Sequence, residues 1–130
     1  MSRRELQARV RKAAGGFAAM GMGSGDTVAL LMRNDIAFLE ASLAATHVGA
    51  YTVPISWHST PSEVAYILED SGAKILVAHA DLLVPLGDDV LGGLTVFAVE
   101  TPSDVVEAYR IDARAAVPRH SAGSWSDWLH

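Results

Sequence analysis

Four short apolar runs, separated by helix-like segments, constrain the fold of this chain more than any other feature. They cover residues 27–32, 51–53, 74–78 and 95–99. Short runs that are apolar at nearly every position are typical of strands buried on both faces of a parallel sheet. Strands that alternate with helices favour right-handed crossovers between parallel neighbours. The sequence therefore predicts an α/β fold with a mainly parallel sheet flanked by helices.

The first helix is predicted from a capping box and an apolar stripe. Ser2 precedes Glu5 by three residues, the spacing at which hydroxyl and carboxylate cap each other's backbone. Apolar residues then recur every three or four positions, at Leu6, Val10, Ala13, Phe17 and Met20. Gly15 and Gly16 each cost up to ~1 kcal/mol relative to alanine inside a helix, so close packing is needed to compensate. The glycine-rich residues 21–26 end this helix.

Two further helices have clear ends. Asn34 or Asp35 is predicted to cap a helix that runs to about residue 48 and ends at Gly49. Its inward face is predicted to hold Phe38, Leu39 and Leu43. The stretch Thr60-Pro61-Ser62-Glu63 combines a cap, a proline at the first helical position and an early carboxylate. That helix is predicted to reach residue 70 and stop at Ser71-Gly72.

The pattern weakens toward the end of the chain. A helical stretch is predicted around residues 81–91, and residues 101–104 form a cap for a helix to about residue 109. Residues 110–123 are typical of a loop, and residues 124–129 of a last helical turn or two. At 130 residues the length favours one domain. We therefore expect a single α/β unit over 1–130, well patterned to about residue 100.

Composition excludes several classes of protein. The net charge is −5, and the basic residues gathered in the first twelve positions are spread along one helix, so no nucleic-acid surface is expected. The chain has no cysteine, which excludes disulfides and thiolate metal sites. The apolar segment 36–50 holds Glu40 and His47 and is too short to span a bilayer. The sequence predicts a soluble, cytoplasmic protein.

Half of the residues are hydrophobic and the mean hydropathy is +0.22. A doubly covered sheet accounts for part of this value. A surface that packs against further sequence accounts for the rest, so we expect uncovered apolar surface and self-association of this chain.

Two turns resemble anion-binding loops but lack the necessary features. Residues 21–26 are rich in glycine, yet they follow a helix and precede a strand, whereas a phosphate loop follows a strand and opens a helix. The turn at 32–35 has the right order, but it has no glycine and Asp35 would repel an anion. Both are predicted to be structural turns.

Metal ligation and nucleophilic catalysis are also not predicted. No two of the five histidines have the i, i+4 spacing of paired ligands on a helix, and His79-Ala80-Asp81 offers only two ligands. No Gly-x-Ser-x-Gly nucleophile elbow is present. The predicted catalytic and metal residues are therefore none.

Polar and aromatic side chains follow one strand directly, at Ser56-Trp57-His58 after Pro54. Loops at the strand ends of open α/β sheets are where ligands tend to bind. The alternative is that Trp57 packs the loop onto the core while His58 lies in solvent. The residues alone leave both interpretations open.

Several motifs resemble those near the start of the adenylate-forming acyl-CoA synthetases. Residues 2–6 are similar to the family's Thr/Ser-Tyr-x-Glu-Leu opening, with Arg4 in place of tyrosine. Residues 21–34 resemble Gly-x-x-x-Gly-Asp-x-Val-Ala followed by Asn, and residues 45–54 resemble Lys-x-Gly-x-x-x-x-Pro, with His47 in the basic position. Ser71-Gly72-Ala73-Lys74 is close to the family's entry into its next strand.

The resemblance implies the N-terminal α/β subdomain of an AMP-forming acyl-CoA synthetase, severed before the phosphate-binding loop. The parent would use ATP, Mg²⁺ and CoA to convert a carboxylic acid to its acyl-CoA, and the missing C-terminal remainder would be this segment's partner. The family's Thr-Gly-rich Lys loop, its ribose-binding Asp and its adenylation Lys have no counterpart here. The fragment is therefore expected to be inactive and to bind none of these ligands well. Trp57 and His58 would lie on the CoA side.

Two alternatives remain at this stage. One is an amino-acid adenylation domain that loads a carrier protein, with the phosphopantetheine thiol in place of CoA. The other is a free-standing α/β binding module of flavodoxin-like or receiver-like type. A receiver needs an acidic pair after its first strand and a phosphorylatable Asp after its third, and residues 32–35 offer one acid at best.

Overall fold

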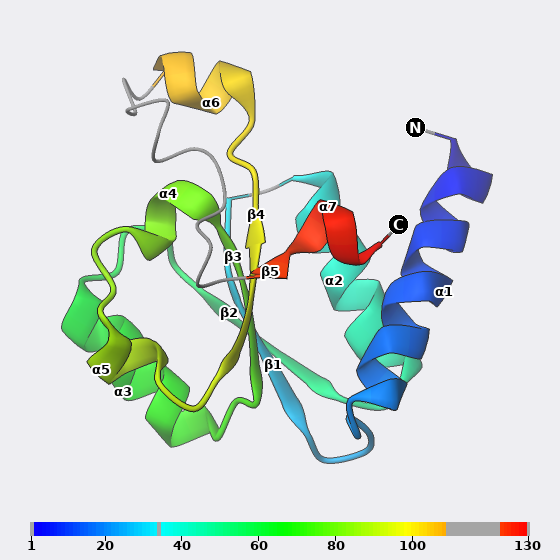
Figure 1. Ribbon diagram of the computed structural model, residues 1–130, viewed down its shortest axis with the longest axis horizontal. Coiled ribbons are helices and arrows are strands. Elements are labelled where there is room, and N and C mark those ends of the chain that lie inside the picture. The colour runs from blue at the N-terminus through cyan, green and yellow to red at the C-terminus, as the bar shows by residue number, and fades with distance from the viewer. Residues whose placement is uncertain (1, 34, 109–122, 130) are drawn as a thin grey trace.

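A computed structural model describes residues 2–33, 35–108 and 123–129 of the chain. Helices and strands alternate along most of it (Figure 1). The helices are α1 (Arg3–Ala19), α2 (Ile36–His47), α3 (Pro61–Ser71), α4 (Ala80–Leu83), α5 (Asp88–Leu91), α6 (Ser103–Ala108) and α7 (Trp125–Trp128). The strands are β1 (Thr27–Leu31), β2 (Tyr51–Ile55), β3 (Ile75–His79), β4 (Thr95–Val99) and β5 (Gly123–Ser124).

The strands form one sheet in the order β2-β1-β3-β4-β5, and every described pair is parallel. This confirms the predicted α/β class and its mainly parallel sheet. Residue 123 was predicted to be loop, and that prediction is wrong, because Gly123 pairs with Phe97 at the start of β5. The rest of the predicted loop, 110–122, lies outside the described residues.

Helices cover both faces of the sheet (Figure 1). α1, α2 and α7 lie on one face, and α3, α4 and α5 lie on the other. β1 and β3 are buried at all five positions, with alternate side chains entering the two hydrophobic clusters. Their continuous apolar sequence is explained by this double cover.

α1 begins as predicted, with the Ser2 side chain accepting a hydrogen bond from the Glu5 N–H at 3.1 Å. The two glycines inside it differ in their surroundings. A Cβ on Gly16 would overlap the indole ring of Trp128, whereas a Cβ on Gly15 would meet no atom within 4 Å. Close packing therefore compensates for Gly16 and does not compensate for Gly15.

The inward face of α2 differs from the prediction. Leu39 and Leu43 are 41% and 42% exposed, and Phe38 is partly buried. Small residues and one acid face inward instead: Ala37, Glu40, Ala41, Ala44 and Ala45. The alanines let the helix lie close to its neighbours. The charge of the inward acid is balanced, because Glu40 forms an ion pair with Arg9 of α1. Glu40 also accepts a hydrogen bond from Trp125 Nε1 at 3.3 Å.

The other predicted helix ends are largely confirmed. Asp35 is the N-cap of α2. Gly49 lies just beyond the C-terminal end of α2 with φ of +82°, a left-handed conformation that glycine adopts without strain. Thr60 and Glu63 form the predicted capping box of α3. The helical stretch predicted at 81–91 is in fact two short helices, α4 and α5, and Pro85 lies between them.

Apolar side chains remain exposed on one stripe of α2, at Ile36, Leu39 and Leu43. Residues three and seven positions apart lie on one side of a helix, so they form a continuous strip. Self-association through such surface stays a prediction. Within the described ranges, no helix combines the length and apolarity needed to cross a bilayer.

The two glycines of α1 give a matched test of packing. Gly16→Ala is expected to lower the free energy of unfolding by about 1–2 kcal/mol, because the new methyl group displaces Trp128. Gly15→Ala is expected to raise it by about 0.5–1 kcal/mol through helix propensity. Urea unfolding followed by circular dichroism measures both. Equal effects of the two substitutions would contradict the close approach of Trp128.

Candidate functional site

The strand order reverses between β1 and β3, and at this switch point the two connections leave in opposite directions. In open α/β sheets, ligands bind in the crevice outside the carboxyl ends of the strands at such a point. Polar or aromatic side chains follow the strands here. They are Arg33 and Asp35 after β1, Trp57 and His58 after β2, His79 and Asp81 at and after β3, and Thr101 after β4.

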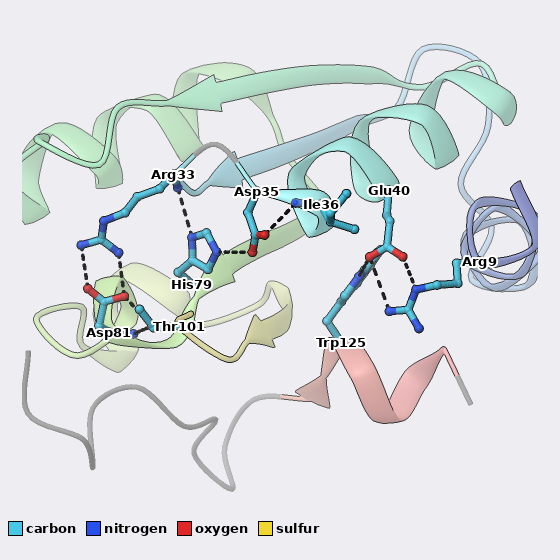
Figure 2. Close-up of polar contacts among 9 residues, drawn as sticks. All are labelled: Arg9, Arg33, Asp35, Ile36, Glu40, His79, Asp81, Thr101 and Trp125. Atoms are coloured by element: carbon cyan, nitrogen blue, oxygen red, sulfur yellow. Dashed lines mark hydrogen bonds and ion pairs between the residues drawn. The ribbon is translucent and has the colours of Figure 1, made fainter. Parts of the chain in front are cut away.

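An ion pair joins the ends of β1 and β3 (Figure 2). Both terminal nitrogens of Arg33 donate to the two carboxylate oxygens of Asp81, each at 2.9 Å. The two side chains are only 11% and 8% exposed. Thr101, which follows β4, also contacts this pair. Its hydroxyl donates to Asp81 Oδ1 at 2.7 Å and accepts from the Asp81 N–H at 3.3 Å.

The environment of Asp81 favours its charged form. Burial raises the pKa of Asp81, but the hydrogen bonds from Arg33 and Thr101 and the positive charge of Arg33 outweigh burial and hold it below its ordinary value. A carboxylate that is ionised and bound on both oxygens is a poor proton donor and a poor metal ligand. Asp81 therefore fixes the strand ends in place.

His79 is fully buried and both of its ring nitrogens are occupied (Figure 2). Nδ1 accepts a hydrogen bond from the Arg33 N–H at 3.1 Å, so it carries no proton. Nε2 lies 3.1 Å from Asp35 Oδ2 and donates to it as the N–H of the neutral ring. Asp35 in turn accepts from the Ile36 N–H at 2.7 Å and so caps α2. His79 thus has no nitrogen left to act as a base.

Trp57 and His58 lie beside this network. The Arg33 guanidinium is 4.9 Å from the centre of the Trp57 ring, within the range of a cation–π contact. The Trp57 and His58 rings are in contact, with their centres 3.7 Å apart and their planes tilted by 31°. Trp57 is half-buried, while His58 is exposed. The two side chains form a small aromatic platform at the strand ends.

The other candidate residues have structural roles. The turn at 21–26 lies at the amino end of β1, opposite the switch point, and Asp26 accepts from the Gly23 N–H at 2.9 Å and pairs with Lys74 at 2.7 Å. Hydrogen bonds from Lys74 and Gly23 lower the pKa of Asp26. Across the described ranges, no group of three or more His, Cys, Asp or Glu is placed to hold a metal ion.

Sequence reasoning identified Trp57 and His58 but missed the Arg33–Asp81–Thr101 cluster. Arg33, Asp81 and Thr101 lie one to three residues beyond the predicted strands at 27–32, 74–78 and 95–99. Polar residues just after consecutive buried strands were the available signal, because the carboxyl ends of parallel strands share one edge of the sheet. Their mutual contacts depend on strand order, which that signal does not contain.

Comparison with known proteins gives a consistent set of relatives. The model of a family described as AMP-binding enzyme matches residues 1–123. A long-chain-fatty-acid–CoA ligase from Thermus thermophilus is 38% identical over 90 residues, covering 69% of this chain and 16% of that protein. Feruloyl-CoA synthase from Amycolatopsis is 38% identical over 85 residues, covering 63% of this chain and 17% of that protein.

Solved structures agree in fold. A benzoate CoA ligase from Burkholderia xenovorans superposes with a TM-score of 0.77 at 19% identity, covering 99% of this chain and 23% of that one. The chain spans less than half of the length of the curated relatives it matches.

The Arg33–Asp81 pair generates a test of stability and its pH dependence. Asp81→Asn leaves a largely buried guanidinium without its counter-charge and is expected to lower the free energy of unfolding by about 3 kcal/mol at pH 7. The folded-state pKa of Asp81 is lower than the ordinary 3.8, so its contribution is present above the unfolded-state value and is lost as pH falls through the folded-state value.

Urea unfolding between pH 7 and pH 2 measures the difference in free energy of unfolding between the original chain and the Asp81→Asn variant. The difference should hold to about pH 5 and shrink below the ordinary value of 3.8. Asp70→Asn on the exposed side of α3 is the matched control and should change stability by less than ~0.5 kcal/mol. A difference for Asp81→Asn that stays constant to pH 2 would contradict the ion pair.

Proposed function

This chain belongs to the AMP-binding enzyme family, and we propose that it is the N-terminal α/β part of an AMP-forming acyl-CoA synthetase. The parent enzyme converts ATP, a carboxylic acid and CoA to acyl-CoA, AMP and pyrophosphate. It works in the cytoplasm, where ATP and CoA are available. The family match over residues 1–123, joined by relatives named as CoA ligases at 38% identity, is the observation that carries this proposal.

The proposed role of the segment is scaffold and one wall of the substrate region. The described residues do not fit ATP and Mg²⁺, because the cation at the switch point, Arg33, is held by Asp81 and the glycine turn lies at the opposite edge. No step of adenylation is therefore assigned to this segment. The residues that hold triphosphate belong to the remainder of the parent chain.

Trp57 and His58 are proposed to lie on the CoA side of the parent's active site. Their rings lie 3.7 Å apart at the carboxyl edge of β2 with planes tilted by 31°, and they offer aromatic surface suited to contact with the planar adenine of CoA. CoA supplies the thiol that accepts the acyl group. Trp57, in cation–π contact with Arg33, would orient the nucleotide end of that ligand.

The receiver-like alternative is disfavoured by the chemistry of the switch point. Asp81 does follow the third strand, but both of its oxygens are bound by Arg33. It is therefore neither a phosphorylation site nor a magnesium ligand. An adenylation domain that loads a carrier protein stays the alternative within the family, and a carrier-domain Ser in the downstream sequence would favour it.

The isolated chain is expected to lack catalysis. Purified residues 1–130 should give no ATP–pyrophosphate exchange with any carboxylic acid, since no described residue is placed to hold the triphosphate. Radiolabelled pyrophosphate incorporation into ATP measures this. Exchange above the level of heat-denatured protein would refute the proposal that the phosphate-binding machinery lies elsewhere.

The CoA assignment is tested in the full-length parent. Replacing both Trp57 and His58 by Ala is expected to raise the KM for CoA about tenfold or more, because base stacking on an aromatic side chain is worth about 1–3 kcal/mol. The KM for ATP should change little. Tyr66→Ala, an exposed aromatic on α3, is the control and should leave both constants unchanged. An unchanged KM for CoA in the double variant removes the assignment.

A further inference from the structure

A groove between α1 and α2 is lined by apolar side chains and by two arginines. Its volume is about 590 Å³, within the range of small-molecule sites. Its apolar lining is Leu6 and Val10 of α1 and Leu43 of α2, and Gln7, Thr46 and His47 also line it. Arg3 and Arg11 line it from α1. It shares no residue with the switch point.

The two arginines that line this groove lack an acidic partner among the described residues. Within the ranges that the structure describes, neither Arg3 nor Arg11 forms an ion pair, whereas Arg9 on the inner side of α1 is paired with Glu40. No described acid lines the groove. Two uncompensated cations therefore flank apolar surface, in a chain whose net charge is −5.

The spacing of the arginines and the apolar residues along α1 suits a linear ligand with one charged end. Arg3 and Arg11 are eight residues apart, about 12 Å along the axis of α1, and Leu6 and Val10 lie between them. A linear apolar chain fits the apolar lining, and an anionic end group fits either cation.

We propose that the α1–α2 groove is a binding site for a single-chain anionic amphiphile, an unbranched aliphatic chain that ends in a carboxylate. The chain lies on Leu6, Val10 and Leu43, and the carboxylate pairs with Arg3 or Arg11. This site does not depend on the proposed synthetase chemistry, because it uses none of the residues at the carboxyl edge of the sheet.

Isothermal titration calorimetry of the 130-residue chain with hexanoate, octanoate and decanoate, below their micelle concentrations, tests the proposal. The Kd is expected to fall about fourfold per added methylene until the groove is filled. Decyltrimethylammonium, with the same tail and the opposite charge, should bind more weakly than decanoate. Equal binding of the two, no dependence on chain length or no binding at all overturns the proposal.

Two substitutions on α2 locate the site. Leu43→Asn should weaken decanoate binding about tenfold, because it removes part of the apolar lining. Leu39→Asn is the matched control, since Leu39 has nearly the same exposure on the same helix, 41% against 42%, but does not line the groove. It should leave the Kd within twofold. Equal losses in both variants place binding elsewhere and overturn the assignment.

A charge-reversal variant tests the carboxylate contact independently of the apolar lining. Arg3→Glu combined with Arg11→Glu should weaken decanoate two- to fivefold and strengthen the cationic amphiphile, as expected for exposed ion pairs. Thermal unfolding of each variant confirms that the fold is retained. Light scattering reports whether a second copy fills the groove instead. A dimer that Leu43→Asn dissociates, together with no decanoate binding, overturns the proposal.

Discussion

The burial of β1 and β3 on both faces is the constraint on which the rest of this structure depends. Two adjacent parallel strands with ten buried positions between them need helices above and below the sheet. α1, α2 and α7 supply one layer, and α3, α4 and α5 supply the other. The first layer packs on the sheet through alanines and an aromatic cluster. The second packs on it mainly through branched aliphatic residues.

The aromatic cluster links residues far apart in the chain. Phe17, Phe97, Trp125 and Trp128 pack together with ring centres 4.4 to 6.2 Å apart. Trp125 is 1% exposed and also donates to the buried Glu40. The segment 123–129 therefore completes the first hydrophobic layer. A buried carboxylate is tolerated there only because Arg9 and Trp125 both bind it.

The polar side chains at the switch point bind mainly one another. Arg33, Asp81, Thr101, His79 and Asp35 bind one another and so hold the carboxyl ends of three strands together. Such a network positions a neighbouring loop well, but it leaves no free acid, base or cation for chemistry among these residues. Trp57 and His58 lie beside this network, with the Trp57 ring 4.9 Å from the Arg33 guanidinium.

The amino-acid sequence by itself determined the α/β class, the mainly parallel sheet, the caps at Ser2 and Thr60, and the family, because these follow from patterns along the chain. It left the cap of α2 open between Asn34 and Asp35, and the structure has Asp35 there. It also placed Trp57 and His58 after a strand. The tertiary structure decided the inward face of α2, the need for glycine at position 16 and the pairing of Arg33 with Asp81. Those features join residues between 31 and 112 positions apart, and only the folded order of strands and helices brings such side chains into contact.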